Sequence, residues 1–230
     1  MDTYGEEHEL LERCAQQVGI RLAGWQIERL LRFLDLLELW SNERRLVGTR
    51  ERPRLITHHI VDSLAAAPAV GTCETIIDIG SGAGLPGIPL AIACPTTSFT
   101  LVDSRGLAAS FLGEAARVLA AKNVRILQER AEKVAPIDGP IYSATIARAW
   151  ASLREFLGVS HSLLKPDGIA VAMKGPRWNE EMESLGSEAM GFRLVRNISY
   201  RLPATRGRML LVFRRRGAGF STRGAKSDEV

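Results

Sequence analysis

Hydrophobic positions recur along this chain at two different spacings. Over 7–18 and 25–43, apolar residues return every three or four positions, with charged residues between them. This spacing is typical of amphipathic helices, and it predicts one helix over each range. A third helix is expected over 55–67, ending near Pro68 and Gly71. The N-terminal part of the chain is therefore predicted to be helical.

From residue 74 onward, short apolar runs alternate with helical patterns. Strands are expected over 75–79, 98–103, 124–128, 142–147, 169–174, 192–200 and 208–213. Helices are expected over 87–93, 107–121, 152–164 and 178–190, with a short turn over 131–134. Such alternation predicts a parallel sheet with helices on both faces, and the last two strands predict a hairpin that inserts one antiparallel strand. The expected fold class is α/β: a doubly wound, mostly parallel seven-stranded sheet with an N-terminal helical extension.

A glycine-rich segment joins the first expected strand to the helix that follows it. The segment over 78–89 reads DIGSGAGLPGIP, so that Asp78 precedes Gly80, Gly82 and Gly84. Glycines permit positive φ angles and let the backbone come close to a ligand. Dinucleotide sites have the spacing Gly-x-Gly-x-x-Gly, whereas this spacing is Gly-x-Gly-x-Gly. Asp78 would repel a pyrophosphate but is suited to hold the amino-acid part of S-adenosylmethionine.

A second acid stands at the end of the second expected strand. This residue, Asp103, follows the apolar run TSFTLV. A carboxylate there can accept hydrogen bonds from both ribose hydroxyls of a nucleoside cofactor. Together with Asp78, it favours a methyltransferase that uses S-adenosyl-L-methionine over a nicotinamide or flavin enzyme. A glycine-rich turn without a ligand is the structural alternative.

The fourth expected strand ends in a cation, Arg148, followed by Ala-Trp-Ala-Ser-Leu. The Asn/Asp-Pro-Pro-aromatic element of methyltransferases that act on exocyclic amines is absent from this position. An arginine can instead face a phosphate, a purine edge or the cofactor carboxylate. A helix cap or an interdomain salt bridge is the alternative role. Guanine N7 has a free lone pair, so its methylation needs alignment rather than a general base.

Length and composition indicate one catalytic domain with an appendage. The 230 residues are 46% hydrophobic and carry a net charge of +4, which mildly favours an anionic partner. We expect a helical extension over 1–70, a cofactor-binding domain over 71–214 and a flexible basic tail over 215–230. Nothing resembles a signal peptide or a membrane span, so a cytoplasmic protein is expected. The three cysteines lack metal spacing, and neither metal nor membrane is expected as a partner.

Basic residues gather in two places. The connector after the second expected helix contains Arg44, Arg45, Arg50, Arg52 and Arg54, and a second set contains Lys174, Arg177, Arg206 and Arg208. Lysine and arginine neutralise RNA phosphates. The candidate RNA-binding residues are Arg44, Arg45, Lys174, Arg206 and Arg208. A solvated charged face is the alternative for both sets.

Several segments together resemble the small-subunit ribosomal RNA methyltransferase G family, also called the glucose-inhibited division protein B family. They are HIVDSL over 59–64, the loop over 78–89, TLVDS over 100–104, ARA over 147–149 with Ser152-Leu153, Lys174-Gly175 and GRMLLV over 207–212. The resemblance spans roughly residues 25–213. It implies the class I fold of S-adenosylmethionine-dependent methyltransferases. It also implies methyl transfer to N7 of a guanine in the decoding-centre region of 16S rRNA, with the rRNA or the small ribosomal subunit as partner.

The resemblance also assigns roles to matching positions. It places cofactor contacts at Gly80, Leu85, Ala131, Glu132 and Arg148, in addition to Asp78, Gly82, Gly84 and Asp103. Arg148 is the expected catalytic residue. Glu132 is expected to meet the adenine amino group, with a solvated residue as the alternative.

Two features depart from the family pattern, and two other functions remain open. Arg44 and Arg45 replace small polar residues near the expected RNA entrance, and Met209 stands where the family often has histidine. One alternative is a methyltransferase of the same fold that acts on another RNA, a protein or a small molecule. The other is a non-catalytic RNA-binding assembly factor.

Overall fold

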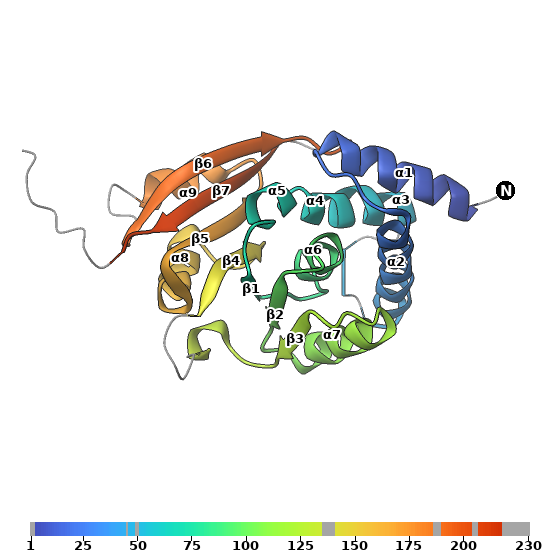
Figure 1. Ribbon diagram of the computed structural model, residues 1–230, viewed down its shortest axis with the longest axis horizontal. Coiled ribbons are helices and arrows are strands. Elements are labelled where there is room, and N and C mark those ends of the chain that lie inside the picture. The colour runs from blue at the N-terminus through green and yellow to red at the C-terminus, as the bar shows by residue number, and fades with distance from the viewer. Residues whose placement is uncertain are drawn as a thin grey trace, which may run out of the picture.

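The computed structural model describes residues 3–44, 46–48, 51–134, 141–185, 190–203 and 207–217. A seven-stranded sheet of order β3-β2-β1-β4-β5-β7-β6 forms its centre (Figure 1). The strands are β1 (Thr75–Ile79), β2 (Ser98–Val102), β3 (Val124–Leu127), β4 (Tyr142–Arg148), β5 (Leu164–Lys174), β6 (Phe192–Tyr200) and β7 (Arg208–Arg215). Strand β7 pairs antiparallel with both β5 and β6. The predicted α/β sheet with one inserted antiparallel strand is confirmed.

The longer helices follow the predicted pattern closely. They are α1 (Thr3–Gln17), α2 (Gly24–Arg44), α6 (Gly87–Ala93), α7 (Gly106–Val118), α8 (Leu153–Leu163) and α9 (Trp178–Leu185). A short 3-10 helix, Ala131–Lys133, occupies the expected turn after β3. Among the described residues, no helix combines the length and the apolarity needed to cross a bilayer.

The third helix, predicted over 55–67, is present as one unbroken helical run over 52–64, followed by a turn and a last short helix. The run consists of α3 (Arg52–Leu55), a π-helix (Ile56–Ile60) and α4 (Val61–Leu64), and the short helix is α5 (Ala67–Val70). Pro68 lacks a backbone N–H and lies in the first turn of α5, which explains a break before it. The wider π turn has no signature in hydrophobic spacing, and such turns are frequent at functional sites. This turn carries His58 and His59.

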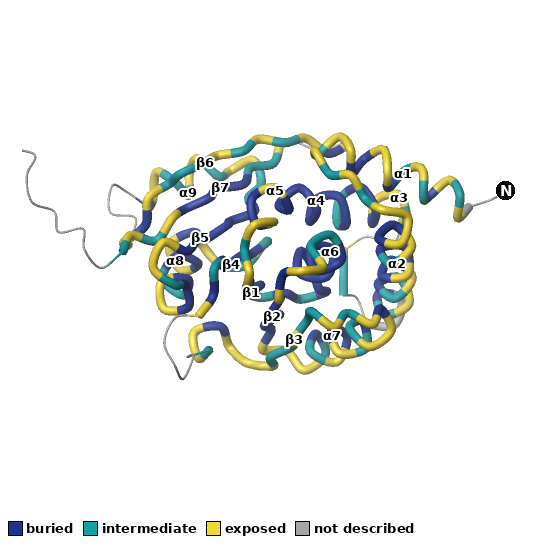
Figure 2. Tube along the Cα trace, in the orientation of Figure 1, coloured by how far each residue is buried: buried dark blue, intermediate teal, exposed yellow. Residues whose placement is uncertain are grey.

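The core has two parts, one on each face of the sheet. Successive strand residues point to opposite faces, so that Ile76 belongs to one hydrophobic cluster and Ile77 to the other. The first cluster gathers side chains from α1, α2, α4, α6 and α7, and the second gathers side chains from α8 and α9. Figure 2 shows these inward faces as buried. Because the first cluster runs through the helical segment into the sheet, the expected boundary at residue 70 does not separate two cores, and the domain division stays a prediction.

One arginine of the basic connector ties the N-terminal helices together. Arg52 Nε lies 2.5 Å from Glu7 Oε1, and its other nitrogens lie 2.6 Å from Glu38 Oε2 and 2.9 Å from Asp35 Oδ1. Arg52 is therefore committed to α1 and α2 rather than to a phosphate surface. The flexible tail expected after residue 214 lies mostly outside the described residues, which end at 217.

Candidate functional site

Two neighbouring cavities open at the carboxyl ends of the strands. The larger has a volume of about 770 Å³ and is lined by residues after β1 and β4 and by the π-helix segment. The smaller has a volume of about 480 Å³ and is lined by residues after β2, β3 and β4. Gly80 and Ala149 border both. Strand β1 pairs with β2 on one side and β4 on the other, so the cavities lie where strand order reverses, which is the usual ligand position in such sheets.

The glycines after β1 have different roles. A Cβ on Gly80 would collide with the indole of Trp150, and one on Gly84 would lie 2.7 Å from Ile88 Cγ1. A Cβ on Gly82 meets nothing closer than an Arg105 nitrogen at 3.3 Å. Gly80 and Gly84 therefore make room for packing, whereas Gly82 lies at the larger cavity with the least packing around it, and its predicted contact with a ligand stays a prediction. All three have positive φ angles.

Asp78 faces the protein interior. Its side chain is fully buried, its Oδ2 accepts a hydrogen bond from the Gly87 backbone N–H at 2.9 Å, and its Oδ1 has no partner among the described residues. Burial raises the pKa of Asp78 to about 7. Asp78 does not line either cavity. Its contact thus connects β1 to the start of α6, and its predicted contact with the cofactor stays a prediction.

Asp103 lies at the end of β2, beside Gly82. Its Oδ2 accepts the Gly82 N–H at 2.9 Å, and its Oδ1 accepts the Arg105 N–H at 2.9 Å. The Arg105 guanidinium also bonds both oxygens, at 3.0 and 3.1 Å. Burial opposes ionisation, but the Arg105 guanidinium and the two N–H groups hold the pKa of Asp103 below its usual value. An ionised carboxylate thus borders the smaller cavity.

The other predicted cofactor residues also border the cavities, except Gly84. Ala131, which is buried, and Glu132, which is exposed, lie at the smaller one. Leu85 lies at the larger one, together with Gly80, Gly82 and Arg148. Gly84 packs behind the loop.

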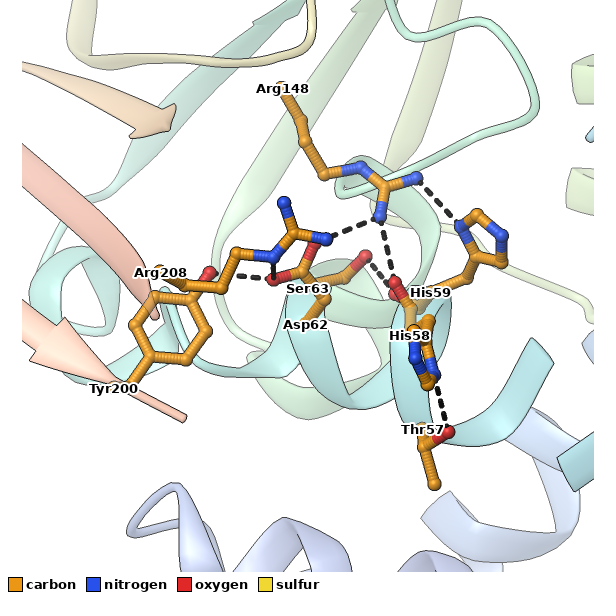
Figure 3. A network of polar contacts seen from close by, with 8 residues as sticks. All are labelled: Thr57, His58, His59, Asp62, Ser63, Arg148, Tyr200 and Arg208. Atoms are coloured by element: carbon orange, nitrogen blue, oxygen red, sulfur yellow. Dashed lines mark hydrogen bonds and ion pairs between the residues drawn. The ribbon is translucent and has the colours of Figure 1, made fainter. Parts of the chain in front are cut away.

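Arg148 is held by residues from two other elements, the π-helix and α4 (Figure 3). Its NH1 lies 3.1 Å from Asp62 Oδ2, and its NH2 lies 3.3 Å from His59 Nδ1. Asp62 Oδ1 also accepts a hydrogen bond from the Tyr200 hydroxyl at 2.6 Å, and Arg208 Nε lies 3.7 Å from the same oxygen. Arg148 therefore makes the salt bridge that the sequence offered as an alternative, and it borders the larger cavity as well.

Sequence reasoning did not assign roles to Asp62 and Tyr200. Asp62 belonged to a matching motif, and a lone acid in the apolar run IVDSLAAA was a signal for a buried ion pair. Only 3% of Asp62 is exposed, so its charge requires partners. Nothing in the local sequence marks Tyr200, because its partner is 138 positions away.

The two adjacent histidines border the larger cavity in neutral form. Burial, followed by the charge of Arg148, lowers the pKa of His59 to about 4. Burial and the charges of Arg54 and Arg208 also lower the pKa of His58. An uncharged imidazole offers one donor and one acceptor rather than two donors.

The predicted RNA-binding residues are only partly described. Lys174 Nζ lies 2.7 Å from Glu181 Oε2, and only 12% of its side chain is exposed. It borders a third cavity of about 260 Å³, together with Arg148, Tyr200 and Arg208. Arg208 also borders the larger cavity, of about 770 Å³. Arg45, Arg206 and the Arg44 side chain lie outside the described part of the chain.

This sheet order, with its reversed strand β7, a glycine loop after β1 and an acid after β2, defines a class I S-adenosylmethionine-dependent methyltransferase. Two solved structures share the fold. TrmN from Thermus thermophilus has a TM-score of 0.54 and 20% identity, covering 68% of this chain and 48% of that one. A SAM dependent methyltransferase from Aquifex aeolicus has a TM-score of 0.53 and 18% identity, covering 70% and 93%.

Sequence similarity identifies the family. Residues 26–202 match the family described as GidB, rRNA small subunit methyltransferase G, and the chain belongs to this family. The Ribosomal RNA small subunit methyltransferase G of Nitrosococcus oceani is 36% identical over 220 residues, covering 95% of this chain and 99% of that protein. The protein of the same name from Klebsiella pneumoniae is 37% identical over 202 residues, covering 88% and 95%. The resemblance found in the sequence is confirmed.

Proposed function

We propose that this enzyme transfers a methyl group from S-adenosylmethionine to N7 of a guanine in 16S rRNA, on the small ribosomal subunit in the cytoplasm. One arrangement carries the proposal. Asp103 borders one cavity and Arg148 the next, while Gly80 and Ala149 border both. A ligand bound along the loop after β1 would therefore have its ribose at Asp103 and its other end beside Arg148.

The residues present fit S-adenosylmethionine. Gly82 leaves space where the backbone must approach the ligand, and Asp103 is an ionised acceptor for ribose hydroxyls. Arg105 shares that carboxylate, but 69% of its side chain is exposed, so it can turn into solvent. Ala131 and Glu132 border the adenine end of the same cavity. When bound, this cofactor supplies an electrophilic methyl group on a sulfonium centre.

The chain's own residues contribute alignment. Because N7 of guanine is a nucleophile without loss of a proton, the site requires no general base there. The Asp62 carboxylate fixes the Arg148 guanidinium from one side, and His59 contacts it from the other. A planar, bidentate donor held in this way orients either a purine edge or a carboxylate. Arg148 is thus the residue that we place nearest the reacting atoms.

Basic residues around the opening would hold the RNA backbone. We assign this role to Arg44, Arg45, Lys174, Arg206 and Arg208. Arg208 is the best supported, because it borders both the largest and the third cavity. Lys174 is already paired with Glu181, so an RNA phosphate would have to compete with that carboxylate.

The test is methyl transfer to small ribosomal subunits purified from cells that lack this protein. Radiolabelled S-adenosylmethionine should label 16S rRNA, and mass mapping of its nucleosides should find one additional 7-methylguanosine. Label in protein or in small molecules instead would support the other methyltransferase class. A protein that binds the subunit but neither binds S-adenosylmethionine in calorimetry nor transfers label would be an assembly factor.

A further inference from the structure

The contacts of His59 fix which of its ring nitrogens carries the proton. An arginine nitrogen donates hydrogen bonds and cannot accept them. Because Arg148 NH2 lies 3.3 Å from His59 Nδ1, Nδ1 must be the acceptor. In the neutral ring the proton is therefore on Nε2. Figure 3 shows that this second nitrogen lies on the side of the ring away from Arg148.

The neighbouring histidine has the opposite tautomer. The Thr57 hydroxyl donates its only proton to the Pro53 carbonyl oxygen at 2.8 Å, while His58 Nδ1 lies 2.7 Å from the same hydroxyl oxygen. His58 Nδ1 must then donate to Thr57, which leaves Nε2 as an acceptor. Both histidines border the larger cavity. Of the two, only His59 presents an Nε2–H donor.

A single fixed donor distinguishes guanine from adenine. Guanine carries the O6 acceptor next to N7, whereas adenine carries an amino group in that place. A donor facing this position pairs with O6 but meets another donor in adenine. A hydrogen bond to O6 also leaves the N7 lone pair free to react. The chemistry that His59 offers therefore matches the edge of the base that must be aligned.

We propose that the His59 Nε2–H group donates a hydrogen bond to O6 of the target guanine and selects guanine over adenine. This inference rests on the proposed function, because it concerns the base that receives the methyl group. Arg148 keeps His59 in the required tautomer, and the π-helix places His59 at the border of the larger cavity. His59 is thus a specificity-determining residue, not a proton-transfer group.

The charges around His59 agree with this role. It faces Arg148 on β4, Asp62 on α4, Arg208 on β7 and its neighbour His58, and burial together with the cations keeps its pKa near 4. The ring is therefore neutral throughout the physiological range. Methylation at N7 places a positive charge on the guanine ring. A neutral donor holds O6 without repelling that charge, whereas an imidazolium would oppose it.

The first experiment measures the tautomer in the intact protein. Nitrogen-15 NMR of histidine-labelled protein should show His59 protonated on Nε2 alone and uncharged down to about pH 5. The chain has four histidines, so loss of one signal set in His59→Gln assigns the resonances. A proton on Nδ1, or an imidazolium at neutral pH, would overturn the inference.

The second experiment measures base selection. Small subunits are assembled with guanine or with 2-aminopurine, which lacks O6, at the target position. Wild-type enzyme should transfer methyl to 2-aminopurine about 10–100-fold more slowly. His59→Ala should lose a similar factor on guanine and show little difference between the two bases. His59→Gln should retain the preference, because its Oε1 can accept from Arg148 while its amide N–H donates to O6.

Two controls separate the possible outcomes. His161 lies on α8 and packs against Phe192, so His161→Ala should keep the full preference for guanine. The affinity of His59→Ala for S-adenosylhomocysteine should equal that of wild type. A loss of affinity of tenfold or more would show that His59 acts on the cofactor, directly or through Arg148, and would overturn the inference, as would undiminished discrimination in His59→Ala. If wild-type enzyme fails to methylate guanine N7 at all, the proposed function itself fails.

Discussion

Asp62 lies directly beside Arg148, with one carboxylate oxygen 3.1 Å from the guanidinium and the other 2.6 Å from the Tyr200 hydroxyl. Only 5% of the Asp62 side chain and 16% of the Arg148 side chain are exposed. The pair is thus shielded from water. Removal of one partner from such a buried pair leaves the other as an uncompensated charge. One acid from the helical segment therefore determines how the cation at the end of β4 is oriented at the cavity.

Removal of the Arg148 guanidinium should disturb alignment at the reacting atoms. Arg148→Ala should reduce the single-turnover rate of methyl transfer by about 100-fold or more at saturating cofactor and RNA. Arg148→Lys should restore little, because an ammonium cannot contact Asp62 and His59 with a planar fork. Full transfer by Arg148→Ala would show that the residue only anchors the helical segment.

Asp103 should control cofactor affinity. Asp103→Ala removes both acceptors at the end of β2 and should weaken binding of S-adenosylmethionine by about 1.5–3 kcal/mol, which corresponds to roughly 10–150-fold in Kd. Titration calorimetry measures this directly. Arg105→Gln is the matched control, because it removes the ion pair but keeps the carboxylate, and it should retain binding. Equal affinity of Asp103→Ala and wild type would place the ribose elsewhere.

Much of the fold was accessible from sequence because hydrophobic spacing reports directly on periodic structure. Alternate residues such as Ile76 and Ile77 pack on opposite faces, which is why the strands were readable. The π-helical segment inside the third helix, Ile56–Ile60, was not accessible in this way, because apolar spacing continues through it.

The site was predictable where a residue type implies one role, and less so where contacts come from distant segments. Asp103 and Gly82 follow from strand ends and glycine spacing. The space beside Gly80 instead belongs to Trp150, which lies 70 positions later. Asp78, like Asp103, is an acid at the end of an expected strand, yet its carboxylate bonds to the start of α6 and does not line the cavity. The sequence therefore indicates which residues belong near the strand ends, but the residues that contact them are known only from the structure.

Two glycines of the loop should separate binding from packing. Gly82→Val places a branched side chain where the ligand must approach, at a φ of 56°, and should abolish binding of S-adenosylhomocysteine while the protein stays folded. Gly84→Ala brings a methyl group within 2.7 Å of Ile88 and 3.2 Å of Leu112. It should lower the melting temperature instead. Calorimetric binding and thermal unfolding of both variants test this, and retained binding in Gly82→Val would contradict it.

Asp78 should make stability depend on pH. Because burial raises its pKa to about 7, from an ordinary 3.8, the folded protein binds more protons than the unfolded chain between about pH 4 and 7. The contribution of Asp78 to the free energy of unfolding therefore falls as pH rises through this window. Asp78→Asn removes that dependence, so its melting temperature relative to wild type should increase from pH 5 to pH 8. A difference that is constant with pH would mean that Asp78 is ionised throughout.

Two arginines of the basic connector should have different roles: Arg52 should stabilise the fold, and Arg54 should bind RNA. Arg52 neutralises Glu7, Asp35 and Glu38, and only 25% of its side chain is exposed. Arg52→Ala should therefore lower the free energy of unfolding by about 1–3 kcal/mol in a denaturant titration. Its effect on the salt dependence of RNA binding should be small, because the guanidinium is already paired.

Arg54 provides the matched comparison, two positions away. Its side chain is 62% exposed, pairs across the surface with Glu51, and borders the larger cavity. Arg54→Ala should leave stability within about 0.5 kcal/mol of wild type. If Arg54 contacts one phosphate, the slope of log K against log salt for RNA binding should become less steep by about 0.7–0.9. The opposite pattern, with Arg52→Ala altering the slope and Arg54→Ala the stability, would reverse the two assignments and move the RNA path away from the opening of the cavity toward α1 and α2.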